Sequence, residues 1–199
     1  MSIRIATKAD LSQILAIYAP YVENTTVSFE YEIPSEETFC DRFWGITRQF
    51  PWLVWEEEGE ILGYAYACAP FERAAYRFCA EPSIYLLPQA QGKGIGRKLY
   101  EALETILTAQ GYRLSYAIIT SENEASLAFH RAMGYRETAR FPGCGYKFGR
   151  WLGVTWMEKS LVSVDTAIKE PIPFPDFVEN NRNFLANLGK LSLSELRKI

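Results

Sequence analysis

The segment Gln91–Arg97, Gln-Gly-Lys-Gly-Ile-Gly-Arg, places glycines at three alternate positions and strongly constrains how the chain can fold. It follows a short apolar stretch at residues 83–87 and precedes an amphipathic stretch that begins at Ile95 and ends near Gly111. Glycine lets a backbone approach a ligand closely. Unpaired N–H groups at a helix N-terminus, with the helix dipole behind them, favour a phosphate or pyrophosphate. The alternative is a tight glycine turn with incidental basic neighbours.

The spacing of these glycines excludes two common nucleotide motifs. Gly92, Gly94 and Gly96 do not form G-x-G-x-x-G, and no G-K-[ST] ends the loop as in a P-loop. A strand, a glycine loop and a helix in this order still predict an α/β domain with an anion site at the start of the helix.

Hydrophobic periodicity and turn residues predict the remaining elements. The order is βααβββαβαβ, a mixed α/β fold. The expected elements are a strand at 3–5, a helix from Leu11 closed by Pro20, a helix capped by Ser35, strands at 52–55 and 61–69 joined at Glu58-Gly59, a strand at 83–87, a helix from Ile95, a strand at 112–119, a helix at 124–133, and one or two closing strands at 146–161.

The chain divides into a domain at residues 1–161 and a tail at residues 162–199. Pro171, Pro173 and Pro175 predict an extended linker. Apolar residues beyond it predict short helices that pack on the domain or on a partner subunit.

Composition excludes several classes of protein. The chain of 199 residues has 21 Lys and Arg against 24 Asp and Glu, a net charge of −3, so a nucleic-acid binder is not expected. No apolar run approaches the ~18–20 residues that span a membrane. The start of the chain does not resemble a signal peptide, so we expect a cytoplasmic protein. A single His and widely spaced cysteines predict neither a metal site nor a disulfide framework: the cysteines are Cys40, Cys68, Cys79 and Cys144.

Two segments together resemble the GNAT superfamily of acyl-CoA N-acyltransferases. Gln91–Arg97 is similar to the family's pyrophosphate loop, and Asn123–Tyr135 is similar to its N-x-x-[AS]-x-x-[LF]-[YH]-x-x-x-G-[FY] signature. Residues 2–160 resemble the phosphinothricin N-acetyltransferase group within it, most clearly over Arg73–Leu86. The resemblance implies a mixed, mostly antiparallel twisted sheet flanked by helices, with acetyl-CoA as cosubstrate and no metal.

The resemblance also implies which residues bind. Ile84, Tyr85 and Leu86 would hold pantetheine through their backbone, with Asn123 and Ser126 as polar contacts. The pyrophosphate would lie on Gln91, Gly92, Lys93, Gly94, Ile95, Gly96 and Arg97. The amino-acid pocket would contain Phe29, Arg73, Ala74, Ala75 and Tyr76.

Three side chains each have a possible catalytic or binding role and a purely structural alternative. Glu81 matches the family's carboxylate and would act as general base, its pKa raised by apolar neighbours; otherwise it is a surface Glu. His130 stands where many members have a Tyr that protonates the thiolate, and it could instead hydrogen-bond the substrate or be a satisfied structural His. The fork of Arg73 suits a carboxylate or phosphinate, and a surface loop Arg is the alternative.

One segment departs from the herbicide-resistance members of the group. Phe148, Leu152 and Gly153 replace their His, His and Asp, and the resulting pattern resembles bacterial relatives that acetylate methionine sulfone and methionine sulfoximine. The implied activity is acetylation of the α-amine of a small L-amino-acid analogue by direct transfer in a ternary complex, in a homodimer. The alternatives are another amine, a protein N-terminus, or a CoA-binding sensor without catalysis.

Overall fold

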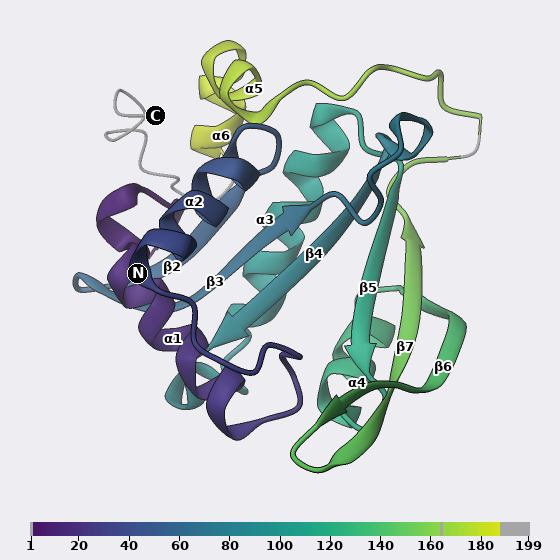
Figure 1. Cartoon of the computed structure of the whole chain (residues 1–199). Helices are drawn as coiled ribbons and strands as arrows, with labels where there is room; N and C mark the ends of the chain where they lie inside the picture. Colours follow the sequence, from purple (N-terminus) through teal and green to yellow (C-terminus); the bar gives the residue numbers. More distant parts are fainter. Residues whose placement is uncertain (1, 164, 188–199) are drawn as a thin grey trace.

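The computed structural model describes residues 2–163 and 165–187, which form a central sheet covered by helices (Figure 1). The sheet contains seven strands in the order β1-β2-β3-β4-β5-β7-β6. The strands are β1 (Ser2–Ile5), β2 (Trp52–Glu57), β3 (Glu60–Cys68), β4 (Cys79–Leu86), β5 (Leu114–Thr120), β6 (Arg136–Lys147) and β7 (Arg150–Ser160). The helices are α1 (Leu11–Asn24), α2 (Glu36–Thr47), α3 (Ile95–Gln110), α4 (Glu124–Ala132), α5 (Phe174–Asn180) and α6 (Arg182–Asn187), with short 3-10 turns η1 (Lys8–Asp10), η2 (Ala74–Tyr76) and η3 (Pro88–Ala90).

The sheet is antiparallel except between β4 and β5, which run parallel. These two strands pair only at Cys79–Leu114 and Ala80–Ser115. Beyond that point they diverge, as Figure 1 shows. The sheet is therefore open on one side of β4, and the carboxyl ends of β4 and β5 lie apart at the edge where α3 and α4 begin.

Helices cover both faces of the sheet (Figure 1). The side chains of α1 and α2 pack on one face with the aromatic residues Trp52 and Tyr64. On the other face α3 packs its apolar stripe, including Leu99 and Leu103, against β2, β3 and β4. A smaller cluster joins α3, α4 and β5 through Tyr100. The expected α/β class and the flanked, mostly antiparallel sheet are confirmed.

Local chemistry explains where several elements begin and end, as predicted. The Ser35 side chain accepts a hydrogen bond from the Thr38 N–H and caps α2. Gly111 ends α3 in the left-handed conformation, with φ of 110°. Glu58 and Gly59 both have positive φ and form the two-residue turn between β2 and β3.

Three boundaries differ from the prediction. Pro20 does not close α1, which continues to Asn24 because Tyr18 and Val22 remain buried on either side of the proline. β4 begins at Cys79 rather than at the predicted residue 83, with Pro82 inside the strand. The closing region is a hairpin of two strands that begins at Arg136, well before residue 146.

Part of the described segment after Leu161 joins the core of the preceding sheet and helices. Phe174 and Phe177 of α5 are buried in the same cluster as α3 and β2, together with Leu185 of α6. Before α5 the chain crosses the end of α3, where the Ile172 N–H donates to the Gln110 carbonyl. Residues 188–199 of the predicted tail lie outside the described part of the chain.

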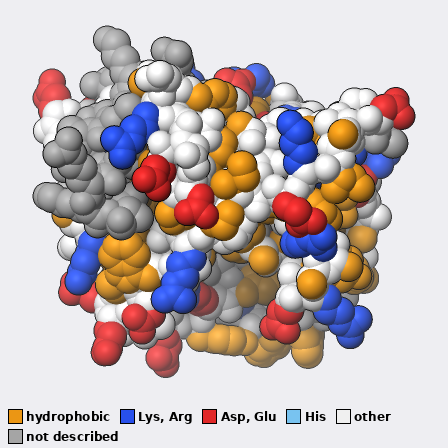
Figure 2. All heavy atoms as spheres, turned by 90° about the horizontal axis from the view of Figure 1, so that it is seen from above, with side chains coloured by type: hydrophobic (Ala, Val, Ile, Leu, Met, Phe, Trp, Pro, Cys, Tyr) orange, Lys and Arg blue, Asp and Glu red, His pale blue; other side chains and the backbone are white. Residues whose placement is uncertain are grey.

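The surface seen from above, around the end of α3 and the segment leading to α5, carries charges of both signs (Figure 2). Acidic and basic side chains are interspersed there with hydrophobic ones, which is not the single-sign surface of a nucleic-acid binder. Among the described residues, no helix has the length and apolarity to cross a membrane.

Candidate active site

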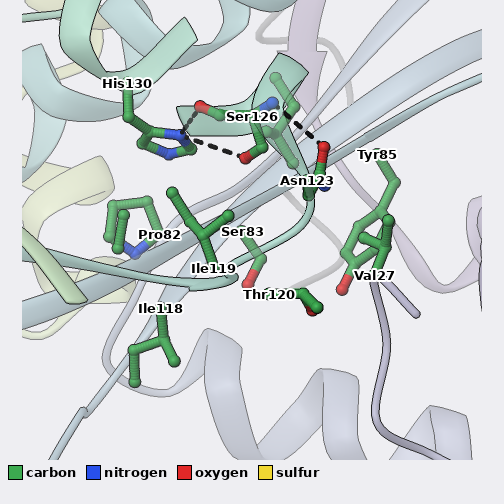
Figure 3. Close-up of a pocket in the computed structure, with 12 residues that line it drawn as sticks. Val27, Pro82, Ser83, Tyr85, Ile118, Ile119, Thr120, Asn123, Ser126 and His130 are labelled. Atoms are coloured by element: carbon green, nitrogen blue, oxygen red, sulfur yellow. Dashed lines mark hydrogen bonds between the residues drawn. The ribbon is translucent and has the colours of Figure 1, made fainter. Parts of the chain in front are cut away.

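A cleft with room for about 70 Å³ of water, open to solvent at its mouth, lies where β4 and β5 diverge. Its walls come from β4, β5, the start of α4 and the loop after α1, as the close-up shows (Figure 3). Five residues that the sequence assigned to the site meet here or at its rim. The lining is Val27, Pro82, Ser83, Ile84, Tyr85, Ala117, Ile118, Ile119, Thr120, Asn123, Ser126 and His130.

The backbone of β4 presents hydrogen-bonding groups to this cleft at alternate residues. The Phe78 carbonyl accepts from the Arg113 N–H on the β5 side, whereas the Leu87 N–H donates to Leu62 on the β3 side. Even-numbered residues of β4 therefore point their N–H and C=O groups towards β5. Pro82 is one of them, so its missing N–H lies on the open edge and leaves the β3–β4 ladder intact. Ile84 presents both of its backbone groups to the cleft.

Ile84, Tyr85 and Leu86 were predicted to bind pantetheine through their backbone, and they differ in whether their N–H and C=O groups are free to bind a ligand. Tyr85 pairs with Tyr64 in the β3–β4 ladder, so only its side chain lines the cleft. At Leu86, the Tyr21 hydroxyl lies 2.6 Å from the carbonyl oxygen and 3.4 Å from the N–H nitrogen. Leu86 also faces the open edge, but Tyr21 contacts its backbone groups, so Ile84 is the residue of the three whose groups are open to a ligand in the cleft.

The glycine loop lies directly after β4 and leads into α3. Gly92 and Gly94 have φ of 71° and 77°, which other residues rarely adopt, and space is open around both. Gly96 has a different role: a Cβ there would lie 3.3 Å from Leu86 Cδ1, so this glycine lets α3 pack closely on β4. The first N–H groups of α3 have no partners inside the helix and remain for an anion.

The basic residues of the loop differ in their contacts. Arg97 donates to Glu101 and to the Ala132 carbonyl, both at 3.3 Å. The Lys98 ammonium lies 5.4 Å from the centre of the Trp55 ring. Gln91 reaches the Tyr21 hydroxyl at 3.4 Å, which ties the start of the loop to α1.

Glu81 lies within β4, immediately after the last residue paired with β5. Residues alternate across a strand, so its side chain lies on the face of Tyr85 and of α1 and α2. Cys68 stands opposite it on β3, with its Sγ 3.7 Å from the Glu81 carbonyl oxygen. Burial raises the pKa of Glu81 to about 7. A carboxyl group with this pKa can accept a proton near neutral pH.

His130 is buried on α4 and lines the cleft beside Ser126 (Figure 3). Its Nδ1 lies 2.8 Å from the Ser126 carbonyl oxygen, and its Nε2 lies 2.9 Å from the Tyr100 hydroxyl. Burial lowers its pKa, which favours the neutral ring. Asn123 caps α4 by accepting from the Ser126 N–H at 3.1 Å.

The predicted substrate residues lie on two separate segments outside the lining of the cleft. Arg73, Ala74, Ala75 and Tyr76 form the exposed connection between β3 and β4, at the end where β4 and β5 pair. There Tyr76 contacts Phe71, which stacks on Trp156. Phe29 belongs to the loop after α1 and packs against Gly145 of β6, where a Cβ would lie within 2.2 Å of its ring.

Lys147 organises the loop after α1, a role that the sequence analysis did not assign. Its buried Nζ donates to the carbonyls of Val22, Thr25 and Ser28 at 2.6–3.0 Å. Because these bonds connect β6 to a segment more than a hundred residues away, spacing alone could not reveal them. One indication of this role was present in the sequence: the loop after α1 and the part of β6 that holds Lys147 both lie within residues 2–160, which resemble the family.

A second set of bonds holds the same loop to the end of β5. Thr26 donates to Glu122, which also accepts two bonds of 2.6 Å from Arg150. The Thr120 hydroxyl donates to the Thr26 carbonyl. The loop therefore borders the cleft, and its Val27 forms part of the cleft wall. In the described part of the chain, no group of three or more His, Cys, Asp or Glu could hold a metal ion.

Comparison with known proteins agrees with this geometry. Residues 3–156 match the family model of the acetyltransferase (GNAT) domain. The chain is 37% identical to phosphinothricin N-acetyltransferase of Alcaligenes faecalis, over 85% of this chain and 87% of the relative. It is 41% identical to an L-methionine sulfoximine/L-methionine sulfone acetyltransferase of Pseudomonas aeruginosa, over 80% and 94%.

A solved structure that contains acetyl-CoA has a similar fold. The GNAT phosphinothricin acetyltransferase of Sinorhizobium meliloti, in complex with acetyl-CoA, superposes with a TM-score of 0.82 at 40% identity, covering 87% of this chain and 96% of that chain. The parted strands, the glycine loop at the start of α3 and these matches lead to one assignment. The chain belongs to the GNAT family and is an acetyl-CoA-dependent N-acetyltransferase.

Proposed function

We propose that the protein acetylates the α-amine of a small L-amino-acid analogue of the phosphinothricin, methionine sulfone or methionine sulfoximine type. The observation that carries the proposal is Glu81, a carboxyl group whose pKa is raised to about 7 where β4 leaves β5. The names of the relatives supply the substrate class. Arg73 on the nearby β3–β4 connection offers a planar cation for the carboxylate of such a substrate.

In the proposed reaction the amine attacks the thioester directly within a ternary complex. Glu81 takes a proton from the attacking nitrogen, directly or through a water. The tetrahedral intermediate then expels the CoA thiolate, which takes up a proton from solvent, and Glu81 releases the proton of the amine to solvent. The backbone of Ile84 faces the cleft and would bind the cofactor arm, and the N–H groups at the start of α3 would hold its pyrophosphate. His130 acts at the cleft wall through Ser126.

A covalent acetyl-enzyme is not part of the proposal. Cys68 is the cysteine nearest to Glu81, and burial raises the pKa of its thiol to about 12. A thiol with this pKa is protonated at neutral pH and is a poor nucleophile.

The proposed assembly is a cytoplasmic homodimer. The β6–β7 hairpin exposes Phe141, Tyr146, Phe148 and Trp151, more large apolar side chains than a solvent-facing hairpin needs. A second copy of the chain would cover them.

Turnover on defined amines tests the proposed function. Thiol release from acetyl-CoA is measured with phosphinothricin, methionine sulfone and methionine sulfoximine in parallel. Turnover on one of them supports the substrate class, and the sulfone and sulfoximine are expected to be the better substrates because Phe148, Leu152 and Gly153 resemble that subgroup. Silence on all three with acetyl-CoA bound would favour another amine, a protein N-terminus or a sensor.

Glu81→Gln tests the proposed base. We expect turnover to fall by about 10²–10⁴-fold because the proton acceptor is lost. Acetyl-CoA affinity, measured by calorimetry, should stay unchanged because the side chain lies outside the lining of the cleft. A variant with wild-type turnover would remove Glu81 from the mechanism.

A further inference from the structure

The hydrogen bonds of His130 determine which of its nitrogens carries the proton. Nδ1 lies 2.8 Å from the Ser126 carbonyl oxygen, and a carbonyl oxygen can only accept. Nδ1 therefore bears the hydrogen. The ring is buried, with rings of Tyr100, Phe129 and Tyr135 each about 5.2 Å away in edge-on contact. A neutral ring protonated at Nδ1 leaves Nε2 as an acceptor.

Tyr100 completes this arrangement from the opposite side of the ring. Its hydroxyl lies 2.9 Å from Nε2 and must be the donor. Tyr100 is itself fully buried on α3, and its hydroxyl faces that of Tyr135, which is bonded to Ser115. Glu104, paired with Lys159 at 2.6 Å, lies near the same tyrosines. The donor to Nε2 is therefore fixed by a buried polar network rather than by solvent.

The same logic fixes the Ser126 hydroxyl. Its Oγ lies 3.3 Å from Nδ1, where it can only accept because Nδ1 carries the hydrogen. The hydroxyl hydrogen of Ser126 thus remains free, and Ser126 lines the cleft beside His130 (Figure 3).

We propose that His130 and Tyr100 are positioning residues: they hold the Ser126 hydroxyl, the cofactor contact that the family resemblance implies, in one orientation with its hydrogen directed into the cleft. The inference rests on the proposed acetyl transfer and assigns His130 a fixed neutral tautomer within it. The imidazole then donates from Nδ1 throughout the reaction and gives up no proton. Ser126 is the group that touches the cofactor.

The tautomer can be measured without turnover. His130 is the single histidine of the chain, so its ¹⁵N ring signals need no assignment. We expect a neutral ring with hydrogen on Nδ1 at pH 7, in the wild-type enzyme with and without acetyl-CoA. Hydrogen on Nε2, or a charged ring, would overturn the proposal even in an enzyme that turns over normally.

Two substitutions at His130 separate positioning from acid catalysis. His130→Asn keeps an N–H donor near the place of Nδ1, whereas His130→Gln places its amide near Nε2. We expect kcat within about threefold of wild type for the first and a loss of about tenfold for the second, the worth of one buried hydrogen bond. Equal loss in both variants would favour a proton donated by the ring.

Tyr100→Phe tests the positioning residue itself. We expect kcat to fall by about 3–10-fold, with the acid limb of the pH profile unmoved because that limb belongs to Glu81. Tyr112→Phe is the matched control, since Tyr112 is also buried at the other end of α3 and accepts from Gln49 at 2.9 Å. Wild-type kcat in Tyr100→Phe would contradict the inference.

Failure of the proposed function gives a different result. If the wild-type enzyme acetylates none of the amines, calorimetry of acetyl-CoA binding replaces kcat. Ser126→Ala should then weaken binding by about 3–10-fold. Unchanged affinity in this variant, with the Nδ1 tautomer observed, would show that Ser126 does not touch the cofactor.

Discussion

Glu81 is a half-buried carboxyl group, and burial raises its pKa to about 7 from an ordinary value of 4.5. In the unfolded chain the group ionises near pH 4.5, whereas in the fold it resists ionisation up to about pH 7. The unfolded state therefore gains stability relative to the fold as the pH rises between these values, and the free energy of unfolding falls. Above pH 7 the protein bears the full cost of a charge in an apolar place.

Glu81→Gln should remove this cost. We expect the variant to gain about 2–3 kcal/mol over wild type between pH 5 and pH 8, measured as the change in the free energy of unfolding in urea. The exposed Glu72→Gln on the β3–β4 connection is the control and should show no such change. A gain that did not depend on pH would mean that Glu81 is not the buried titrating group.

Side-chain roles could be predicted only where the motif and the local environment agreed. The raised pKa of Glu81 was expected from its apolar neighbours, and the structure shows it. The tautomer of His130 could not be expected, because it depends on Tyr100, thirty residues away on another helix. The same holds for Lys147, whose three carbonyl acceptors lie more than a hundred residues earlier in the chain.

At the scale of elements, the proposed pyrophosphate site depends on the backbone conformation of the loop between β4 and α3. Gly94 precedes the first turn of α3 with φ of 77°, and no atom lies within 4 Å of where its Cβ would be. Gly94→Val places a branched side chain where the pyrophosphate would lie. We expect acetyl-CoA affinity to fall at least about tenfold in calorimetry, because charged hydrogen bonds from the backbone are lost.

Gly59→Val is the matched control for this change. Gly59 has φ of 87°, equally open surroundings and a place in the distant β2–β3 turn. Both variants should lose about 1–2 kcal/mol of stability through backbone strain. Only the Gly94 variant should lose affinity; equal affinities in the two folded variants would make the pyrophosphate assignment wrong.

Elements could be predicted where local chemistry determines them. Ser35, Glu58-Gly59 and Gly111 each act within a few residues of themselves, and each boundary was correct. β6 lacks such a signal: its residues are mostly exposed, and its register against β7 shifts at two irregular points, one between Glu137 and Ala139 and one between Phe141 and Gly145. It is an edge strand held by backbone hydrogen bonds to β7. Such pairing leaves no alternating hydrophobic pattern in the sequence, so it could not be predicted.

At the scale of the whole molecule, the described residues after Leu161, up to residue 187, contribute side chains to the core of the domain. Phe177 is buried against α3 and β2, and the Arg77 guanidinium makes two bonds of 2.6–2.7 Å to Glu170. The segment that leads to α5 runs past the end of α3, so close that a Cβ on Gly111 would lie 3.3 Å from the carbonyl oxygens of Lys169 and Glu170. A change in this segment should therefore alter stability, although it is remote from the cleft.

Phe177→Ala separates stability from catalysis. The cavity it leaves should cost about 3–5 kcal/mol in the free energy of unfolding, measured with urea. Ile168→Ala, at a site that is 72% exposed in the same segment, should cost almost nothing. The KM for acetyl-CoA should be unchanged in both folded variants, because neither residue lines the cleft. A stable Phe177→Ala variant would mean that α5 does not pack on the sheet and α3, and a raised KM would mean that this packing shapes the start of α3 as well.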